Sequence, residues 1–157
     1  MTQADDTLRR ASIAARFDAA EGYDAAAHIQ RRCVTALMER IRTATTEQTP
    51  ASILEFGCGT GFLTARLAGQ FPQASLLASD LAPGMIARTR QHLSGANIHF
   101  HVMDAEHPDI SGPFDLIASS LCLQWFSNRT EGLRRLCDLL APQGRLMVAT
   151  LLQGSLD

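Results

Sequence analysis

Residues 53–61 read ILEFGCGTG, and this stretch decides the fold of the chain. It follows a short apolar strand, predicted over 52–56, and leads at once into a helix. Glycines at a turn from strand to helix let the backbone bend sharply and let a ligand lie against bare main chain. A dinucleotide-binding turn would need a small residue at the position where this sequence has Phe62. The pattern present is instead an acidic residue followed by spaced glycines: Glu55, Gly57, Gly59 and Gly61.

Strands and helices alternate along the chain after Pro50. Apolar runs predict four further strands, over 75–79, 97–103, 114–119 and 145–151. Pro83 opens one intervening helix, and Asn128 caps another, with Glu131 as its capping-box partner. The apolar face of that last helix is predicted to comprise Leu133, Leu136, Cys137 and Leu140. The APQG stretch at 141–144 predicts a turn into the last strand. This alternation is typical of βαβ units, so the sequence predicts an α/β fold with a parallel sheet.

The first fifty residues are predicted to be helical and to end in a linker. In the second of these helices the apolar residues fall at helical spacing and form one stripe: Ile29, Cys33, Val34, Leu37, Met38 and Ile41. The Thr-rich stretch TATTEQTP, residues 43–50, marks the linker. A chain of 157 residues suits one domain. Within it we expect residues 1–50 to form a helical segment that covers the active site, and residues 51–157 to form the α/β core.

All 14 basic residues of the chain are Arg, and no Lys occurs in it. This excludes phosphate-loop NTPases and pyridoxal-phosphate enzymes, which need a Lys. The formal net charge of −2 offers no basic surface of the kind that binds nucleic acid. The N-terminal stretch has no apolar signal region, and no apolar run reaches the roughly 18 residues of a membrane-spanning helix. We therefore expect a cytoplasmic protein that binds neither nucleic acid nor membrane.

The cysteine, histidine and arginine patterns favour structural roles. The four cysteines form no C-x-x-C pair, so we interpret all of them as buried small apolar residues in a reducing compartment. His99 and His101 share one face of a predicted strand, but no third ligand is evident and we expect no metal. The pairs Arg9-Arg10 and Arg134-Arg135 are predicted to lie on exposed helix faces.

Acidic residues stand at the ends of three predicted strands, where ligands bind in doubly wound folds. Glu55 can accept hydrogen bonds from a cationic group such as an ammonium. Asp80 offers two oxygens that match a ribose diol, although an Asp here could also cap the helix that begins at Pro83. Asp104 can accept from an adenine amino group while the next backbone amide, that of Ala105, donates to a ring nitrogen.

Together these residues resemble the class I S-adenosylmethionine-dependent methyltransferases, over about residues 52–150. The resemblance implies a Rossmann-like parallel sheet with strand order 3-2-1-4-5 and flanking helices. It also implies that Glu55 and the glycines face the methionine part of S-adenosylmethionine, Asp80 the ribose, and Asp104-Ala105 the adenine. In this family the residues after the fourth strand, here 119–121, close over the methionine and the sulfonium. The implied cofactor-binding set is Tyr23, Gln30, Glu55, Gly57, Gly59, Gly61, Asp80, Leu81, Asp104, Ala105, Ser120 and Leu121, and the product is S-adenosylhomocysteine.

Short motifs near both ends resemble the malonyl-acyl-carrier-protein O-methyltransferases of biotin synthesis. They are RFDAAEGYDAAAHIQ (16–30), SSLCLQWF (119–126) and TLLQGSLD (150–157), and they occur in the order of that family. The resemblance implies methyl transfer to the free carboxyl of malonyl-acyl-carrier protein or malonyl-CoA, with Tyr23 as the catalytic residue over the active site. The alternative for Tyr23 is a packing role on the N-terminal helix, and Trp125 fits a pocket wall better than a chemical role.

The sequence departs from this family at its end. It stops at Asp157, just after the predicted fifth strand, so we expect the final antiparallel hairpin and the helical lid of the family to be absent. The fifth strand would then be an open edge, which allows a monomer or an edge-paired dimer. Two alternative functions stay open. One is another class I methyltransferase, acting on a small molecule such as a quinone or a carboxylate. The other is a non-catalytic paralogue that binds the cofactor.

Overall fold

The computed structural model of the chain describes residues 3–19, 24–95 and 97–152. Two helices come first, α1 (Gln3–Ala19) and α2 (Asp24–Ala44). Strands and helices then alternate through β1 (Ser52–Phe56), α3 (Phe62–Gln70), β2 (Ser75–Asp80), α4 (Pro83–His92), β3 (Ile98–Val102), β4 (Phe114–Ser120), the 3-10 helix η1 (Leu123–Trp125), α5 (Arg129–Cys137) and β5 (Leu140–Ala149).

The five strands form one parallel sheet in the order β3-β2-β1-β4-β5. This confirms the predicted α/β fold and its strand order. Residues 53–55 of β1 pair with 76–78 of β2 on one side and with 116–118 of β4 on the other. Because all strands run in the same direction, their carboxyl ends meet at one edge of the sheet, and the glycine turn after β1 lies at that edge.

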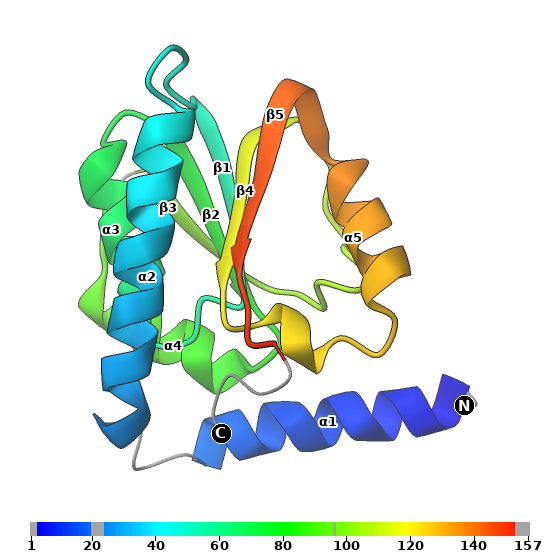
Figure 1. Ribbon diagram of the computed structural model, residues 1–157. Helices are drawn as coiled ribbons and strands as arrows, with labels where there is room; N and C mark the ends of the chain where they lie inside the picture. Colours follow the sequence, from blue (N-terminus) through cyan, green and yellow to red (C-terminus); the bar gives the residue numbers. More distant parts are fainter. Residues whose placement is uncertain (1–2, 20–23, 96, 153–157) are drawn as a thin grey trace.

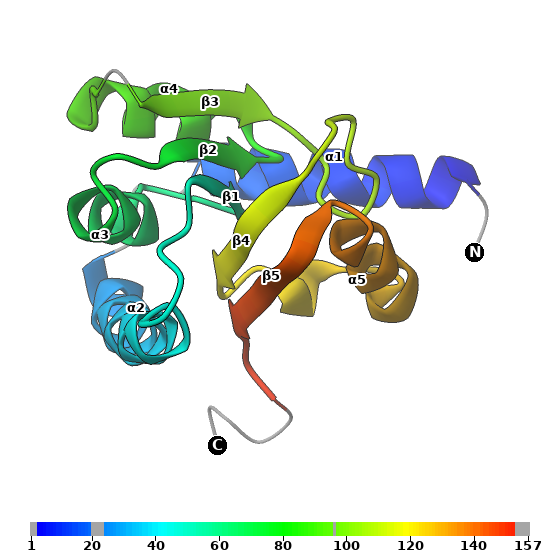
Figure 2. The same ribbon diagram turned by 90° about the horizontal axis from the view of Figure 1, so that it is seen from above.

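Helices cover both faces of the sheet (Figures 1 and 2). On one face, Leu67 of α3 and Leu37 and Ile41 of α2 pack with Ile53. On the other face, Leu136 of α5 packs with Leu54. Neighbouring residues of β1 thus enter different apolar clusters, as the period of two along a strand requires. No helix within the described ranges is long and apolar enough to span a membrane.

Helix α1 lies apart from both faces and crosses the carboxyl edge of the sheet (Figure 1). Helix α2, by contrast, packs against the sheet through Val34, Leu37, Met38 and Ile41, which are all buried. Ile29, which the sequence places in the same stripe, is 42% exposed and so does not belong to the buried face of α2.

The start of β5 differs from the prediction. We predict a turn over 141–144 and a strand over 145–151, whereas one strand runs over Leu140–Ala149 and carries the predicted turn as an irregularity in its pairing with β4. A Cβ at Gly144 would lie 2.7 Å from the backbone oxygen of Phe114. Glycine permits this close approach, and the strand continues through the irregularity.

The end of α5 and the cysteines need a second correction. Helix α5 ends at Cys137, so Leu140 belongs to β5 and not to the apolar face of the helix. Cys137 is exposed, which makes the interpretation of all four cysteines as buried wrong. Cys58 is buried, and Cys33 and Cys122 are partly buried.

One of the two hydrogen bonds predicted for the cap of α5 is present. The side chain of Asn128 accepts a hydrogen bond from Glu131 N at 3.1 Å. The reciprocal bond of a capping box involves another residue, because Asn128 N donates to Glu106 Oε1 at 2.8 Å. The carboxylate of Glu131 pairs instead with Arg134 and Arg135.

Candidate functional site

A pocket lies at the carboxyl edge of the sheet, under α1. Three α1 residues, Arg10, Ile13 and Ala14, contribute to its lining. The lining also includes nine residues that the sequence assigns to a cofactor site: Gln30, Glu55, Gly57, Gly59, Asp80, Leu81, Asp104, Ala105 and Ser120. The fold thus brings together residues from four strand ends and from α2.

The glycine turn needs its glycines for different reasons. Gly57 and Gly59 adopt positive φ angles of 70° and 54°. A Cβ at Gly57 would lie 2.5 Å from Cys122 Sγ, so a larger residue would push the loop after β4 away. A Cβ at Gly59 would meet no described atom within 4 Å, so the backbone there is open to the pocket. Gly61 lies outside the pocket lining, and a Cβ on it would be 2.7 Å from Thr89 of α4.

Glu55 is buried at the end of β1, with 1% of its surface exposed. Its Oε2 atom has no hydrogen-bond partner among the residues that the structure describes. Burial, reinforced by the negative charge of Asp80, raises the pKa of Glu55 to about 8. A buried carboxyl oxygen without a partner is costly, so a cationic donor that entered the pocket would be favoured beside Oε2.

Asp80 holds the turns on either side of it. Its Oδ2 accepts a hydrogen bond from Gly59 N at 2.8 Å, and its Oδ1 accepts one from Ala82 N at 2.9 Å. Ala82 is the residue that precedes α4. The helix start has no side-chain cap, so the alternative in which Asp80 caps α4 is wrong. Asp80 instead holds the backbone two residues further along and the glycine turn beside the pocket.

Asp104 connects the loop after β3 to α1. Its Oδ1 accepts from Glu106 N at 3.0 Å. Its Oδ2 lies 2.7 Å from Arg10 Nη1 and 3.1 Å from His107 Nδ1. Ala105, next in the chain, is buried and lines the pocket.

Of the remaining residues predicted for the site, some line the pocket and others do not. The Ser120 hydroxyl is buried in the pocket lining and has no partner within the described part of the chain. Leu121 lies outside the lining, adopts a φ of 58° and donates its backbone N–H to Ala149 of β5. Trp125 is 42% exposed and forms part of the pocket wall. Tyr23 lies outside the described residues.

Several lining residues were not predicted. Arg9 and Arg10 were expected on an exposed face, but Arg10 lines the pocket. Arg9, which is outside the lining, donates to Trp125 O at 2.8 Å and also contacts the Ser127 hydroxyl. A charged pair on a helix carries no signal for such contacts. Glu106 also lines the pocket, and its position directly after Asp104-Ala105 is a signal that the sequence did offer.

The two histidines of β3 that the sequence raised as a possible metal pair lie apart from any metal-ligand cluster in the described structure. His101 Nε2 lies 2.9 Å from Asp109 Oδ1, and His99 is exposed on the same strand. Within residues 3–19, 24–95 and 97–152, no group of three or more His, Cys, Asp or Glu side chains is placed to hold a metal ion.

Comparison with known proteins gives one family match. The family described as "Methyltransferase domain" matches residues 53–144. The chain is 45% identical over 146 residues to the "Biotin biosynthesis bifunctional protein BioCD" of Bordetella avium, covering 92% of this chain and 31% of that protein. It is 38% identical over 145 residues to the malonyl-[acyl-carrier protein] O-methyltransferase of Magnetococcus marinus, covering 91% of this chain and 53% of that protein. The chain therefore spans about half or less of the length of these relatives.

Solved structures share the fold. The plantazolicin methyltransferase BpumL, in complex with a pentazolic desmethylPZN analog and S-adenosylhomocysteine, superposes with a TM-score of 0.72 at 22% identity. The match covers 94% of this chain and 60% of that chain, so it extends over the N-terminal helices as well as the sheet.

Proposed function

Since this chain belongs to the methyltransferase-domain family, we propose that it binds S-adenosylmethionine and serves the O-methylation of the free carboxyl of a malonyl thioester on acyl carrier protein. The name of the relative from Magnetococcus marinus supports the substrate, and the name of the relative from Bordetella avium supports a place in biotin biosynthesis. The observation that supports this cofactor most strongly is the excess of acidic side chains in the pocket lining. Its described lining holds the carboxyl groups of Glu55, Asp80, Asp104 and Glu106, against one guanidinium, that of Arg10.

The pocket residues fit S-adenosylmethionine, which carries a positive ammonium and a positive sulfonium. We assign the ammonium to Glu55, whose buried Oε2 needs a donor. Open space beside Gly59 lets the ligand lie against the backbone. We assign the ribose to Asp80 and the adenine to Asp104 and Ala105.

In the proposed reaction, S-adenosylmethionine supplies a methyl group activated by its sulfonium. A malonyl carboxyl is already ionised near pH 7, so the chain needs no general base to make it nucleophilic. The protein's task is then to align the carboxylate with the methyl group and to exclude water. Helix α1 covers the pocket and contributes to the exclusion of water. Tyr23 stays our proposed catalytic residue, in contact with cofactor or substrate.

The test is transfer of labelled methyl from S-adenosylmethionine to malonyl-acyl-carrier protein, compared with malonyl-CoA. Acetyl-acyl-carrier protein is the matched control, because it lacks the free carboxyl. We expect a methyl ester on the malonyl carrier protein and no label on the acetyl form. Binding of S-adenosylhomocysteine without any methyl transfer would overturn the substrate, and failure to bind it would overturn the cofactor as well.

A further inference from the structure

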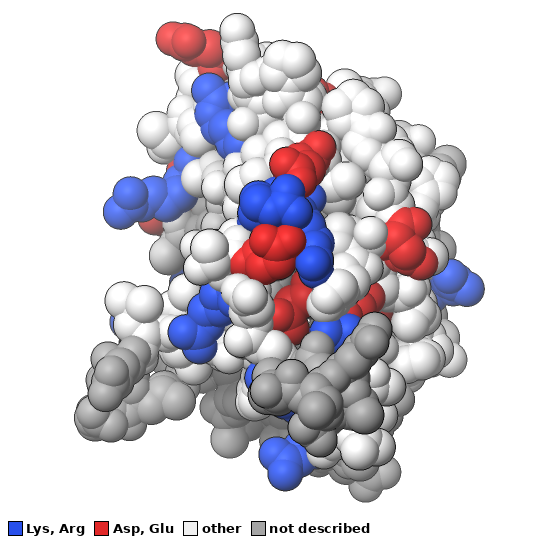
Figure 3. Space-filling view, turned by 90° about the vertical axis from the view of Figure 1, so that its right-hand side faces the viewer, with Lys and Arg blue, Asp and Glu red and all other residues white. Residues whose placement is uncertain are grey.

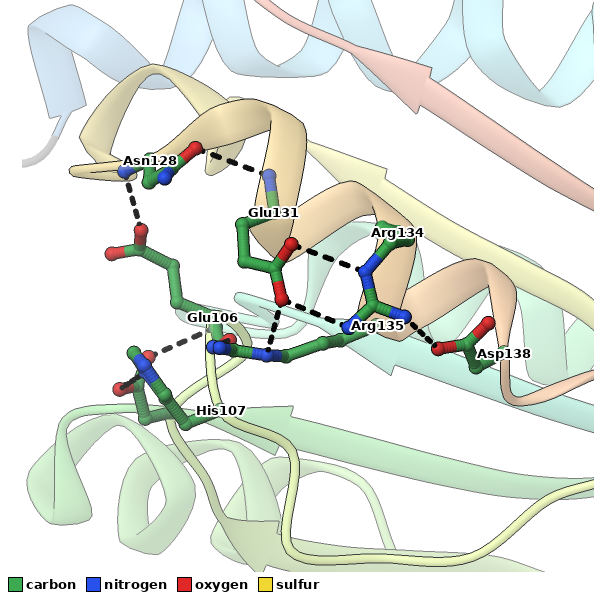
Figure 4. Close-up of polar contacts among 8 residues, drawn as sticks. Glu106, His107, Asn128, Glu131, Arg134, Arg135 and Asp138 are labelled. Atoms are coloured by element: carbon green, nitrogen blue, oxygen red, sulfur yellow. Dashed lines mark hydrogen bonds and ion pairs between the residues drawn. The ribbon is translucent and has the colours of Figure 1, made fainter.

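The loop after β3 is fastened to α5 through Glu106 (Figure 4). Glu106 is 6% exposed, and its Oε1 accepts a hydrogen bond from Asn128 N at 2.8 Å at the start of α5. Its backbone oxygen accepts one from Arg135 Nη1 at 2.8 Å. Its backbone N–H donates to Asp104 Oδ1. One residue therefore connects the Asp104 carboxylate to two points on α5.

Arg135 is itself held in place for this contact. Its Nε lies 3.2 Å from Glu131 Oε1, one turn earlier in α5, and a glutamate preceding an arginine by four residues is the favourable order on a helix. The Arg135 side chain is 33% exposed. The guanidinium thus reaches from a helix surface to a backbone oxygen of the loop.

Arg134 is a neighbour with the same charge and different contacts. It pairs with Glu131 at 2.8 Å and Asp138 at 2.7 Å, both on or at the end of its own helix, and its side chain is 59% exposed. Acidic and basic side chains alternate on the face of the molecule that carries α5 (Figure 3). Arg134 belongs to this solvated network, whereas Arg135 also reaches the loop.

Gly132 lets the loop approach α5 closely. A Cβ at this position would lie 2.6 Å from the Phe126 ring and 3.4 Å from Glu106 Cγ. Phe126 is buried and lines the pocket, and its ring lies 5.9 Å from that of Phe56. The helix and the loop are therefore packed together as well as hydrogen-bonded.

We infer that Glu106 and Arg135 are positioning residues that hold the adenine end of the cofactor site. The inference rests on the proposed function, which assigns adenine to Asp104 and Ala105. The backbone over residues 104–106 sets the direction in which the Asp104 carboxylate and the Ala105 N–H point. Hydrogen bonds weaken steeply as their geometry departs from linear. A shift of this loop would therefore weaken the hydrogen bonds proposed to adenine. Arg135 acts entirely through the Glu106 backbone.

The test compares Arg135→Gln with Arg134→Gln. Each substitution removes one guanidinium from the same turn of α5 together with its contacts to Glu131, which are two hydrogen bonds for Arg134 and one ion-pair contact for Arg135. Calorimetry measures binding of S-adenosylhomocysteine and of its deaminated analogue, in which hypoxanthine replaces adenine. The analogue presents a carbonyl where adenine presents an amino group, and its adjacent ring nitrogen carries a proton. The Asp104 carboxylate therefore loses the amino donor assigned to it, and the Ala105 N–H loses the ring nitrogen that would accept its hydrogen bond.

We expect the unmodified chain to prefer S-adenosylhomocysteine to the analogue. In Arg135→Gln the affinity for S-adenosylhomocysteine should fall about tenfold while that for the analogue stays unchanged, so the preference shrinks. Arg134→Gln should stay within about twofold for both ligands. Glu106→Ala should match Arg135→Gln, and Glu106→Gln should restore much of the preference because its amide oxygen can still accept from Asn128 N.

Two results separate this inference from the proposed function. Equal behaviour of the two arginine variants, or an equal loss of affinity for both ligands in Arg135→Gln, overturns the positioning role while leaving cofactor binding intact. If the unmodified chain binds neither ligand, the proposed function itself fails and the inference falls with it. Urea unfolding of each variant establishes that the chain is folded during the measurement.

Discussion

Arg10 of α1 and Asp104 of the loop after β3 form an ion pair, with Nη1 2.7 Å from Oδ2 and both side chains 22% exposed. The helix that covers the pocket is thus anchored to the carboxylate that we propose for adenine. Arg9, next in the chain, is bonded to the loop after β4 through Trp125. Adjacent residues of α1 therefore connect it to two different loops of the pocket.

Arg10→Met should speed both entry and release of S-adenosylhomocysteine, by about fivefold, because α1 loses one of its anchors. Methionine keeps an apolar stem for packing and removes the charge. Stopped-flow fluorescence of Trp125 measures both rates, since this side chain forms part of the pocket wall. Arg16→Met, at an exposed position of the same helix, is the control. Unchanged rates in Arg10→Met would contradict the anchoring role of the pair.

Glu55→Gln should remove a dependence of stability on pH. Burial raises the pKa of Glu55 from its ordinary value of 4.5 to about 8, so between these values the folded chain holds a proton that the unfolded chain has released. The stabilisation is complete at low pH and is lost as the pH rises through about 8, by up to about 1.4 kcal/mol per unit. Urea unfolding at about pH 5.5 and about pH 7.5 should give a steeper fall for the unmodified chain than for Glu55→Gln. Equal falls in both chains would refute the shifted pKa.

Asp80→Asn should weaken both stability and cofactor binding. An amide offers one acceptor oxygen, so either Gly59 N or Ala82 N loses the partner it has now. We expect the free energy of unfolding to fall by about 1–3 kcal/mol. We expect the affinity for S-adenosylhomocysteine to fall about tenfold or more. Asp138→Asn, at a 61% exposed side chain, should change stability by less than about 0.5 kcal/mol. A neutral Asp80→Asn would show that the glycine turn does not depend on this carboxylate.

Gly132→Ala and Gly69→Ala should change stability in opposite directions. A methyl group on Gly132 would meet the Phe126 ring at 2.6 Å, which should destabilise the chain by about 1–3 kcal/mol although Ala is the better helix former. At Gly69 of α3 a Cβ would meet nothing within 4 Å in the described structure, so Ala should stabilise by up to about 1 kcal/mol. Denaturant titration measures both, and effects of the same sign would refute the close approach at Gly132.

The cysteines should differ in their rates of thiol labelling because they differ in exposure. Burial raises the pKa of the Cys58 and Cys122 thiols, which keeps them protonated and unreactive. Cys137 is exposed at the end of α5. Iodoacetamide followed by peptide mass analysis should therefore label Cys137 well before Cys58 or Cys122 in the folded chain. Equal labelling of the three thiols would show that the pocket opens freely.

Local patterns in the sequence predicted the alternation of strands and helices, whereas the order of the strands in the sheet was predicted from the family resemblance. The cap at Asn128 was visible because its partner lies three residues away. The other half of that cap was not, because Glu106 reaches Asn128 N from a different loop. The turn predicted over 141–144 was wrong, because this stretch lies inside β5 and shifts its pairing register with β4, and strand pairing is not a local pattern.

The sequence by itself determined the parallel sheet and placed Glu55, Asp80 and Asp104 at strand ends, because periodicity and turn chemistry are local and parallel strands bring their ends to one edge. Only the tertiary structure decided what surrounds these carboxylates. Arg10 meets Asp104, and Arg135 reaches the loop beside it, through contacts between segments far apart in the chain. Such contacts leave no periodic signal, since packing chooses the partners once the elements have formed.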